Sequence, residues 1–281
     1  MNKEQNSFLE NIMKGVGGRI NKTLTNKYKK AGLNWFKIKK LKHLPYNSPH
    51  KYPFLDSAVE FNNGPELLHS LQEIFIDEVY KIDFGHPAPY VIDCGANIGL
   101  SVLYMKIQHP SAKIIAFEPD PVNFSFLQKN VNAYRLRNVE LRNEAVWKES
   151  TTLEFVSDGT LGSKLNAAPG QQGTVKVKAA RLRDLLSEKV DFVKMDIEGA
   201  EYDVLKDCGD TLKNVHYLFI EFHGFFARMN ELTEILQLVQ DNGFAYYIKE
   251  ASNVYPTPFD RKGGKKPYDV QQNIFCFRID T

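Results

Sequence analysis

A glycine-containing turn and a distant acidic residue have the types and spacing that suit nucleotide binding. The segment Asp93-Cys-Gly-Ala-Asn-Ile-Gly99 follows an apolar run, and Glu118 stands nineteen residues after Gly99, at the end of a second apolar run. Gly95 and Gly99 allow the backbone to pass close to a ligand, and N–H groups at a helix N-terminus can meet a carboxylate. An acid at a strand end can accept hydrogen bonds from both ribose hydroxyls. These residues predict a site for an adenosine-containing ligand.

The residue between the two glycines distinguishes two classes of ligand. Dinucleotide-binding turns read G-x-G-x-x-G, because a pyrophosphate needs close approach of the backbone at the central glycine. Asn97 occupies that position here, in a G-x-N-x-G arrangement. Its side chain takes the room of a pyrophosphate and suits a ligand with an amino-acid moiety, so the sequence favours S-adenosylmethionine over NAD. An NAD-dependent oxidoreductase is the alternative enzyme, and a scaffold with a vestigial pocket is the non-catalytic alternative.

Polar side chains recur at period two where two later strands are expected to end. Lys194, Asp196 and Glu198 share one side of an extended segment, as do Glu221 and His223. In open α/β sheets, ligands bind at the carboxyl ends of the strands. His223 is our candidate general base, because an ordinary histidine pKa of ~6.5 suits proton removal near neutral pH. Asp196 is expected to orient the acceptor or to touch the cofactor.

The same side chains allow two other interpretations. Lys194 can pair with Glu198 or Glu201 in a structural ion-pair network, which we favour for Lys194 and Glu201. A divalent cation that acidifies an acceptor hydroxyl is the second interpretation. Its ligands would be Asp196, Glu221 and His223. Because this spacing is not diagnostic of a metal site, the sequence assigns no metal.

Strand and helix signals alternate from Tyr90 onward, which predicts an α/β fold with a mostly parallel sheet and helices on both faces. Seven core strands are expected, at 90–94, 113–117, 139–146, 192–195, 217–222, 245–248 and 274–277. Helices are expected between them, at 100–107, 124–131, 182–186 and 231–240. Two extra strands, at 152–156 and 175–179, flank a Gly-rich stretch from Gly159 to Gly173 and predict a β-hairpin insertion.

The N-terminal part of the chain differs from the rest in charge. Residues 1–50 hold eleven Lys and Arg against two Glu, a net charge of +9 in a chain of net charge +2. Such a segment is either a solvated helical face or a surface for an anionic partner. Trp35 and Phe36 lie among its lysines, a pattern typical of contact with an anionic membrane surface or of docking on the main domain, and docking is the commoner fate. Residues 45–64 are rich in Pro, Asn and Ser and predict connecting structure.

The domain boundary is expected where a helix starts at Pro65, since proline suits the first helical position. We therefore divide the chain into a basic, partly helical lead with its connecting segment, 1–64, and a Rossmann-like domain, 65–281.

Composition limits the location and the partners. The chain is 43% hydrophobic and 25% charged, with no secretory signal and no apolar run of the roughly 20 residues that span a bilayer. Cys94, Cys208 and Cys276 are too scattered for a disulfide framework or a zinc cluster and are expected to be buried free thiols. These features favour a cytoplasmic protein, with peripheral contact between residues 1–44 and the inner membrane surface as an additional expectation. Nucleic acid is not an expected partner, because the chain has neither an Asn/Asp-Pro-Pro-aromatic segment nor paired catalytic cysteines.

Three segments resemble the signatures of the FkbM family of methyltransferases. They are Val91-Ile-Asp-Cys-Gly-Ala-Asn-Ile-Gly-Leu-Ser101, Phe117-Glu-Pro-Asp-Pro121 and Lys194-Met-Asp-Ile-Glu-Gly-Ala-Glu201. The resemblance runs from about Ile74 to His223. It implies a class I methyltransferase fold, S-adenosylmethionine as methyl donor, and a hydroxyl acceptor on a sugar of a glycan or glycolipid or on a secondary metabolite.

The resemblance also implies roles for individual residues around the donor. The methionine side of the site would be formed by Asp93, Gly95, Ala96, Asn97 and Gly99. Glu118 would hold the ribose, and Glu144 with Ala145 would meet the adenine. Residues 1–60 and those after about Asn253 lie outside the resemblance, so the acceptor is expected to be selected there.

Overall fold

The computed structural model describes residues 28, 31–156, 174–261 and 266–279. These residues fall into two compact units, one ending at Lys81 and the other beginning at Ile82.

The first unit contains a β-hairpin where the sequence predicted connecting structure. Strand β1 (His50–Phe54) pairs antiparallel with β2 (Ser57–Phe61). Four alternating side chains of the pair are buried: Tyr52, Phe54, Val59 and Phe61. The frequent prolines had indicated connecting structure in place of strands. Pro53 is nevertheless tolerated here, because an edge strand can lack a ladder hydrogen bond.

Helix α2 (Trp35–Lys42) confirms the helical character of the basic segment. It begins at the N-cap Asn34 and buries Leu41. Trp35 and Phe36 are 64% and 76% exposed.

The helix predicted from Pro65 is present but changes its winding. Helix α3 (Gly64–Ser70) has Asn63 as its N-cap, and a π-helical segment (Leu71–Ile76) continues from it. The apolar spacing that predicted one longer helix therefore spans two kinds of helical turn.

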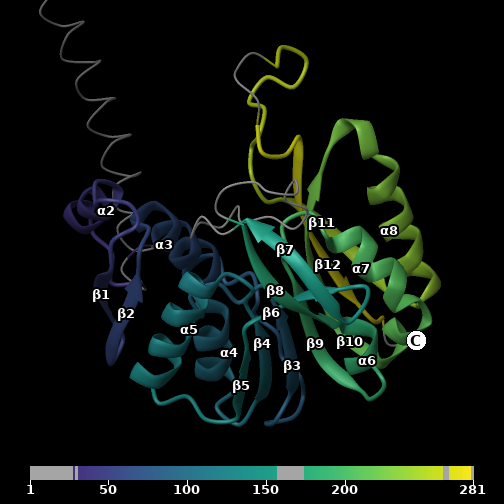
Figure 1. The fold of residues 1–281 in the computed structure, drawn as a ribbon, viewed down its shortest axis with the longest axis horizontal. Helices are drawn as coiled ribbons and strands as arrows, with labels where there is room; N and C mark the ends of the chain where they lie inside the picture. The colour runs from purple at the N-terminus through teal and green to yellow at the C-terminus, as the bar shows by residue number, and fades with distance from the viewer. Residues whose placement is uncertain (1–27, 29–30, 157–173, 262–265, 280–281) are drawn as a thin grey trace, which may run out of the picture. The chain divides into compact units, whose positions relative to one another are not determined.

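The second unit is built on a seven-stranded sheet in the order β11-β12-β10-β9-β3-β4-β5 (Figure 1). Its strands are β3 (Tyr90–Cys94), β4 (Lys113–Phe117), β5 (Val139–Arg142), β9 (Val190–Met195), β10 (Val215–Gly224), β11 (Ala245–Glu250) and β12 (Val270–Phe277). Strand β12 is antiparallel to both of its neighbours, and the other neighbouring pairs are parallel. The predicted mostly parallel seven-stranded sheet is confirmed. Strands β3, β4 and β5 follow one another toward one edge of the sheet, and β9 and the later strands lie on the other side of β3. The strand order therefore reverses between β3 and β9, and ligands bind at such a point in open α/β sheets.

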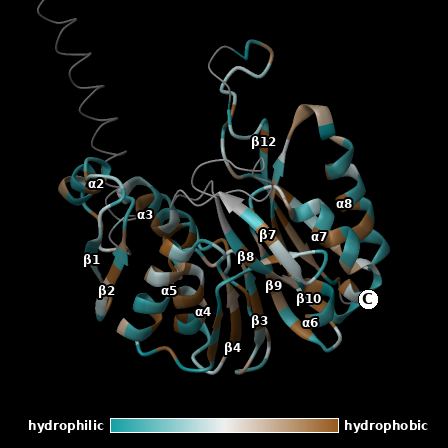
Figure 2. Ribbon diagram, viewed as in Figure 1, coloured by the Kyte–Doolittle hydropathy of each residue, from teal (hydrophilic) through white to brown (hydrophobic). Residues whose placement is uncertain are grey.

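Helices cover both faces of this sheet, as predicted. Figure 1 shows α4 (Leu100–Gln108) and α5 (Pro121–Ala133) on one side, and α7 (Glu201–Cys208) and α8 (Asn230–Asp241) on the other. Hydrophobic residues concentrate on the central strands between them (Figure 2). Strands covered on both faces are continuously apolar, which explains why the sequence located β3 and β4 correctly.

The strand predicted at 139–146 is two strands in two different sheets. Strand β5 ends at Arg142, and β6 (Glu144–Trp147) pairs with β8 (Thr174–Arg181) instead. Between them Asn143 donates hydrogen bonds from Nδ2 to the carbonyl oxygens of Glu118 and Pro119, at 2.8 and 3.1 Å. Asn143, at the break between the two strands, therefore anchors the segment that follows β4, where Glu118 lies.

The predicted β-hairpin insertion is confirmed. Strand β7 (Thr151–Val156) pairs antiparallel with β8, and the short helix α6 (Leu182–Leu185) follows β8. The Gly-rich stretch between these two strands lies outside the described residues.

Two expectations from composition concern the cysteines and membrane helices. Cys94, Cys208 and Cys276 are buried free thiols, as predicted. Within the described part of the chain, every helix is too short or too polar to cross a bilayer.

Candidate active site

The turn between β3 and α4 has a left-handed backbone at three residues. The φ angles of Gly95, Asn97 and Gly99 are +92°, +48° and +91°. Asparagine tolerates this region better than most residues with a side chain. The N–H groups of Gly95 and Ala96 both donate to the carbonyl oxygen of Phe117, at 3.0 and 2.8 Å. The turn is therefore fixed directly against the end of β4.

The two glycines also have a packing role within the protein, beside the role that the sequence predicts for them. A Cβ on Gly95 would lie 1.9 Å from the carbonyl oxygen of Asp196, and one on Gly99 would lie 2.7 Å from Cδ1 of Leu127. Both contacts are far inside van der Waals distance. The glycines thus let the turn pack against the end of β9 and against α5, whether or not a ligand is present.

Glu118 joins the strand end to the turn, as its position predicted. Its side chain is buried; Oε2 accepts a hydrogen bond from the N–H of Asn97 at 2.8 Å, and Oε1 accepts one from the N–H of Asp120 at 2.9 Å. Each carboxylate oxygen has two acceptor positions, so one remains on each for a ribose hydroxyl. Burial raises the pKa of Glu118 to about 8, although the two N–H donors oppose this effect.

The residues expected to meet an adenine are less clearly placed. Glu144 is the half-buried first residue of β6, whereas Ala145 is 2% exposed and packs in the hydrophobic core. The nearest link between this segment and the site is Asn143, which holds the carbonyl oxygen of Glu118.

Lys194 connects the turn to the end of β9, with partners that the sequence did not predict. Its buried Nζ lies 3.5 Å from Oδ1 of Asp93 and 3.2 Å from Oδ2 of Asp196, and it donates a hydrogen bond to the carbonyl oxygen of Gly95. The expected pairing with Glu198 or Glu201 is wrong, because the side chain extends toward β3 and not toward α7. Burial alone would lower the pKa of Lys194, but Asp196, Asp93 and Glu221 together hold it above its ordinary value.

Asp93 lies beneath the turn and retains one acceptor atom. Oδ2 accepts a hydrogen bond from the hydroxyl of Ser101. Oδ1 is buried and has no hydrogen-bond donor among the described residues, since Lys194 is at ion-pair distance only. A buried acceptor without a donor is costly unless a ligand satisfies it.

His223 lies inside β10 and not after it, because the strand continues through Gly224 in register with β12. Its ring is 2% exposed, and Nδ1 is 3.1 Å from Oε1 of Glu201. Glu201 also accepts hydrogen bonds from the N–H groups of Ile197 and Gly199. Glu201 therefore orients the ring of His223. The sequence had placed this buried acid in an ion-pair network with Lys194.

The other ring nitrogen faces carboxylates. Nε2 of His223 lies 3.7 Å from Oε2 of Glu198 and 3.7 Å from Oε1 of Glu221. Burial alone would lower the pKa of His223, but Glu201, Glu198 and Asp196 raise it to about 10. A pKa raised in this way does not favour His223 as a simple general base.

Sequence reasoning missed the environment of Glu198. This residue has a φ of +57°, an uncommon conformation for a residue with a side chain, and strain of this kind concentrates at functional sites. The hydroxyl of Tyr268 donates to its Oε2 at 2.8 Å and lies 3.0 Å from its carbonyl oxygen. Burial raises the pKa of Glu198 to about 7, against the opposing effect of His223. Tyr268 is seventy residues away in the chain, so no local pattern could have revealed this contact.

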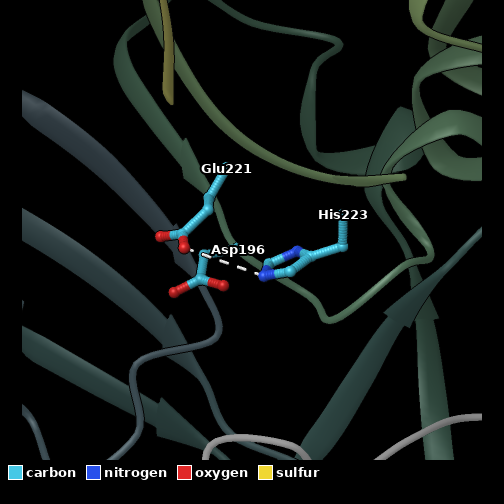
Figure 3. A group of neighbouring side chains, drawn as sticks. All are labelled: Asp196, Glu221 and His223. Atoms are coloured by element: carbon cyan, nitrogen blue, oxygen red, sulfur yellow. Dashed lines mark ion pairs between the residues drawn. The ribbon is translucent and has the colours of Figure 1, made fainter. Parts of the chain in front are cut away.

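Side chains from two neighbouring strand ends converge, as their spacing predicted. Figure 3 shows Asp196, Glu221 and His223 pointing toward one another. One potential ligand atom from each lies within 4.8 Å of the others. Because β9 and β10 are parallel neighbours, their carboxyl ends bring these residues to the same edge of the sheet.

The strand order, with β12 reversed, and the glycine turn beside a strand-end acid define a class I methyltransferase. Comparison with known proteins agrees: a family model described as the methyltransferase FkbM domain matches residues 93–246. The chain belongs to the FkbM methyltransferase family and is an enzyme of that kind. All the site residues described above except Tyr268 lie within the matched range.

Individual relatives come from fungi, bacteria and archaea. Methyltransferase 1 of Beauveria bassiana is 32% identical over 213 residues, which cover 66% of this chain and 82% of the relative. The 31-O-demethyl-FK506 methyltransferase FkbM of Streptomyces tacrolimicus is 24% identical and covers 69% and 88%. The hexuronic acid methyltransferase AglP of Haloferax volcanii is 26% identical and covers 54% and 67%.

Proposed function

We propose that this enzyme transfers a methyl group from S-adenosylmethionine to a hydroxyl of a sugar or of a secondary metabolite. The observation that carries the donor assignment is the Glu118 carboxylate, held against the turn by the N–H of Asn97. It retains acceptor positions on both oxygens, which matches the two hydroxyls of a ribose.

The charge of the site supports this donor over a dinucleotide. S-adenosylmethionine carries a sulfonium and an ammonium group, whereas NAD carries two negative phosphates. The unsatisfied Oδ1 of Asp93 suits a positively charged donor. Lys194 lies between the carboxylates of Asp93 and Asp196, so two acids share one cation beside the turn, an arrangement that disfavours a pyrophosphate.

The acceptor class is supported by the relatives and by the cluster of acids. The names of two relatives specify an oxygen of FK506 and a hexuronic acid, and both compounds carry hydroxyl groups. A hydroxyl must lose its proton as it is methylated, and a positioned proton acceptor contributes about 10²–10⁴-fold to such a step. Carboxylates at the ends of β9 and β10 are suited to receive that proton.

We assign two residues to the acceptor side. When bound, S-adenosylmethionine supplies a methyl carbon that bonds to the acceptor oxygen while the carbon–sulfur bond breaks and its electron pair stays on sulfur. The carboxylate of Asp196 lies just after β9, where Oδ2 is 3.2 Å from Nζ of Lys194, and we assign it to accept the hydrogen bond of the acceptor hydroxyl and to take its proton. His223, oriented by Glu201, stabilises the negative charge that develops on that oxygen. Positioning of this kind can contribute roughly 7–11 kcal/mol.

The donor assignment is tested by calorimetric titration with S-adenosylhomocysteine, with NAD as the parallel ligand. We expect micromolar binding of S-adenosylhomocysteine and no binding of NAD. If the folded protein binds neither ligand, the donor proposal fails and a scaffold function gains support. Binding of NAD alone would favour the oxidoreductase alternative.

The role of His223 is tested with His223→Asn, whose amide can still donate to Glu201 but which lacks Nε2. Once labelled methyl transfer onto fractionated glycans and metabolites identifies an acceptor, kcat should fall about 10²–10⁴-fold. The affinity for S-adenosylhomocysteine should stay within about threefold of the wild type, because His223 does not touch the donor turn. Unchanged turnover would remove His223 from the catalytic machinery.

A further inference from the structure

A cluster of ionisable side chains lies at the ends of β9 and β10, and carboxylates dominate it. We define this acidic cluster as Asp93, Asp196, Glu198, Glu201 and Glu221 together with Lys194 and His223. Within it, Lys194 pairs with two of the carboxylates, and His223 approaches the other three. Burying charge is costly unless it is neutralised, and here five acids face two cationic groups.

Three members of the acidic cluster have the geometry of a cation site. The nearest ligand atoms of Asp196, Glu221 and His223 lie within 4.8 Å of one another, and Nε2 of His223 is 3.7 Å from Oε1 of Glu221. That separation is too long for a hydrogen bond. Ligand atoms bound to one metal at ~2.0–2.2 Å are roughly 3–4 Å apart, a range that includes the 3.7 Å between His223 and Glu221.

The buried imidazole provides an independent observation. The side chain of His223 is 1% exposed, and among the described residues nothing makes a hydrogen bond with Nε2. Its other nitrogen is held by Glu201, which is itself fixed by two backbone N–H groups. A carboxylate that fixes the far nitrogen is the usual support of a metal-binding histidine.

The remaining acids of the acidic cluster are already engaged. Tyr268 donates to Glu198, Ser101 donates to Asp93, and Glu201 orients the imidazole. Only one carboxylate oxygen of Asp196 contacts Lys194, at 3.2 Å. The side chains of Asp196, Glu221 and His223 converge, as Figure 3 shows.

We propose that Asp196, Glu221 and His223 bind one divalent transition-metal cation, such as Mn²⁺. One imidazole with two carboxylates suits such an ion better than an all-oxygen cation such as Mg²⁺ or Ca²⁺. Metal binding itself is independent of the proposed function. Its role rests on that function: a cation here would act as a Lewis acid on the acceptor hydroxyl and so favour loss of its proton.

The test is a titration of the chelator-treated, desalted full-length protein with MnCl₂, followed by the electron paramagnetic resonance signal of free Mn²⁺. We expect one equivalent to bind per chain. Glu221→Gln and Asp196→Asn, which preserve side-chain shape, should each weaken binding by about tenfold or more. Glu250→Gln, which changes an exposed glutamate at the end of β11, is the matched control and should bind as the wild type does.

Two results would overturn the proposal. One is no Mn²⁺ binding by wild-type protein whose circular dichroism shows it to be folded. The other is equal affinity in Glu221→Gln, Asp196→Asn and Glu250→Gln, which would indicate adventitious surface binding. S-adenosylhomocysteine is titrated into the same metal-free samples. Donor binding without Mn²⁺ binding defeats the metal site alone, and Mn²⁺ binding without donor binding defeats the proposed donor alone.

Discussion

Replacing Glu118 by glutamine is expected to weaken the binding of S-adenosylhomocysteine roughly 100-fold at pH 8, since hydrogen bonds to a charged acceptor contribute about 1.5–3 kcal/mol each. The variant loses the charge that faces the ribose hydroxyls. Its amide nitrogen would also lie against a backbone N–H, because Asn97 and Asp120 both donate to the wild-type carboxylate. Isothermal titration calorimetry of the two proteins measures the ratio of affinities.

The same substitution should abolish a pH dependence of binding. The pKa of Glu118 is raised to about 8, so at lower pH the ligand-free carboxyl is protonated and must lose its proton to accept both hydroxyls. The wild-type affinity should therefore rise by up to about tenfold per pH unit below 8 and level off above it. Because titration of the ligand's own amino group affects both proteins equally, the ratio between wild type and Glu118→Gln isolates the carboxyl. A ratio that stays constant from pH 6 to pH 9 would contradict this account.

A matched control separates this effect from a general loss of negative charge. Glu140 lies on the neighbouring strand β5, where its side chain is 53% exposed and pairs with Arg142. Glu140→Gln removes the same charge without touching the turn, so its affinity and pH profile should match those of the wild type.

Local patterns were sufficient to predict the strands and the helix that flank the glycine turn. Strands β3 and β4 are buried on both faces and therefore appear in the sequence as apolar runs. The turn between β3 and α4 contains two glycines in left-handed conformations, which few other residues adopt. Because parallel neighbours end at the same edge, the contact between Glu118 and Asn97 follows from strand order.

Other parts of the candidate site depended on tertiary contacts that no local pattern contains. The break at Asn143 exists because its side chain bonds the carbonyl of Glu118, 25 residues earlier. The partners of Lys194 were misassigned because spacing along one strand cannot tell whether a lysine turns toward β3 or toward α7. His223 was expected to have an ordinary pKa, but its pKa depends on carboxylates from other segments.

The packing of the turn against β9 leads to a prediction of a large loss of stability. Gly95 has a φ of +92°, and an added Cβ would lie 1.9 Å from the carbonyl oxygen of Asp196. Gly95→Ala is expected to lower the free energy of unfolding by about 3 kcal/mol or more, because it combines an unfavourable left-handed backbone with overpacking against backbone atoms. Thermal unfolding should show a fall in Tm of about 6–12 °C.

Gly85→Ala separates the two contributions to this loss. Gly85 also has a positive φ, of +69°, but a Cβ there would meet nothing within 4 Å. Its replacement should cost about 1–2 kcal/mol from the backbone alone. If the two variants were destabilised equally, the turn would not be packed against Asp196 as described. Relieving the clash in Gly95→Ala must displace either the turn or the carbonyl of Asp196. We therefore expect Gly95→Ala to lose more stability than Gly85→Ala and also to bind S-adenosylhomocysteine more weakly, whereas Gly85→Ala binds it as the wild type does. That result would show that the contact between the turn and β9 also maintains the proposed donor site.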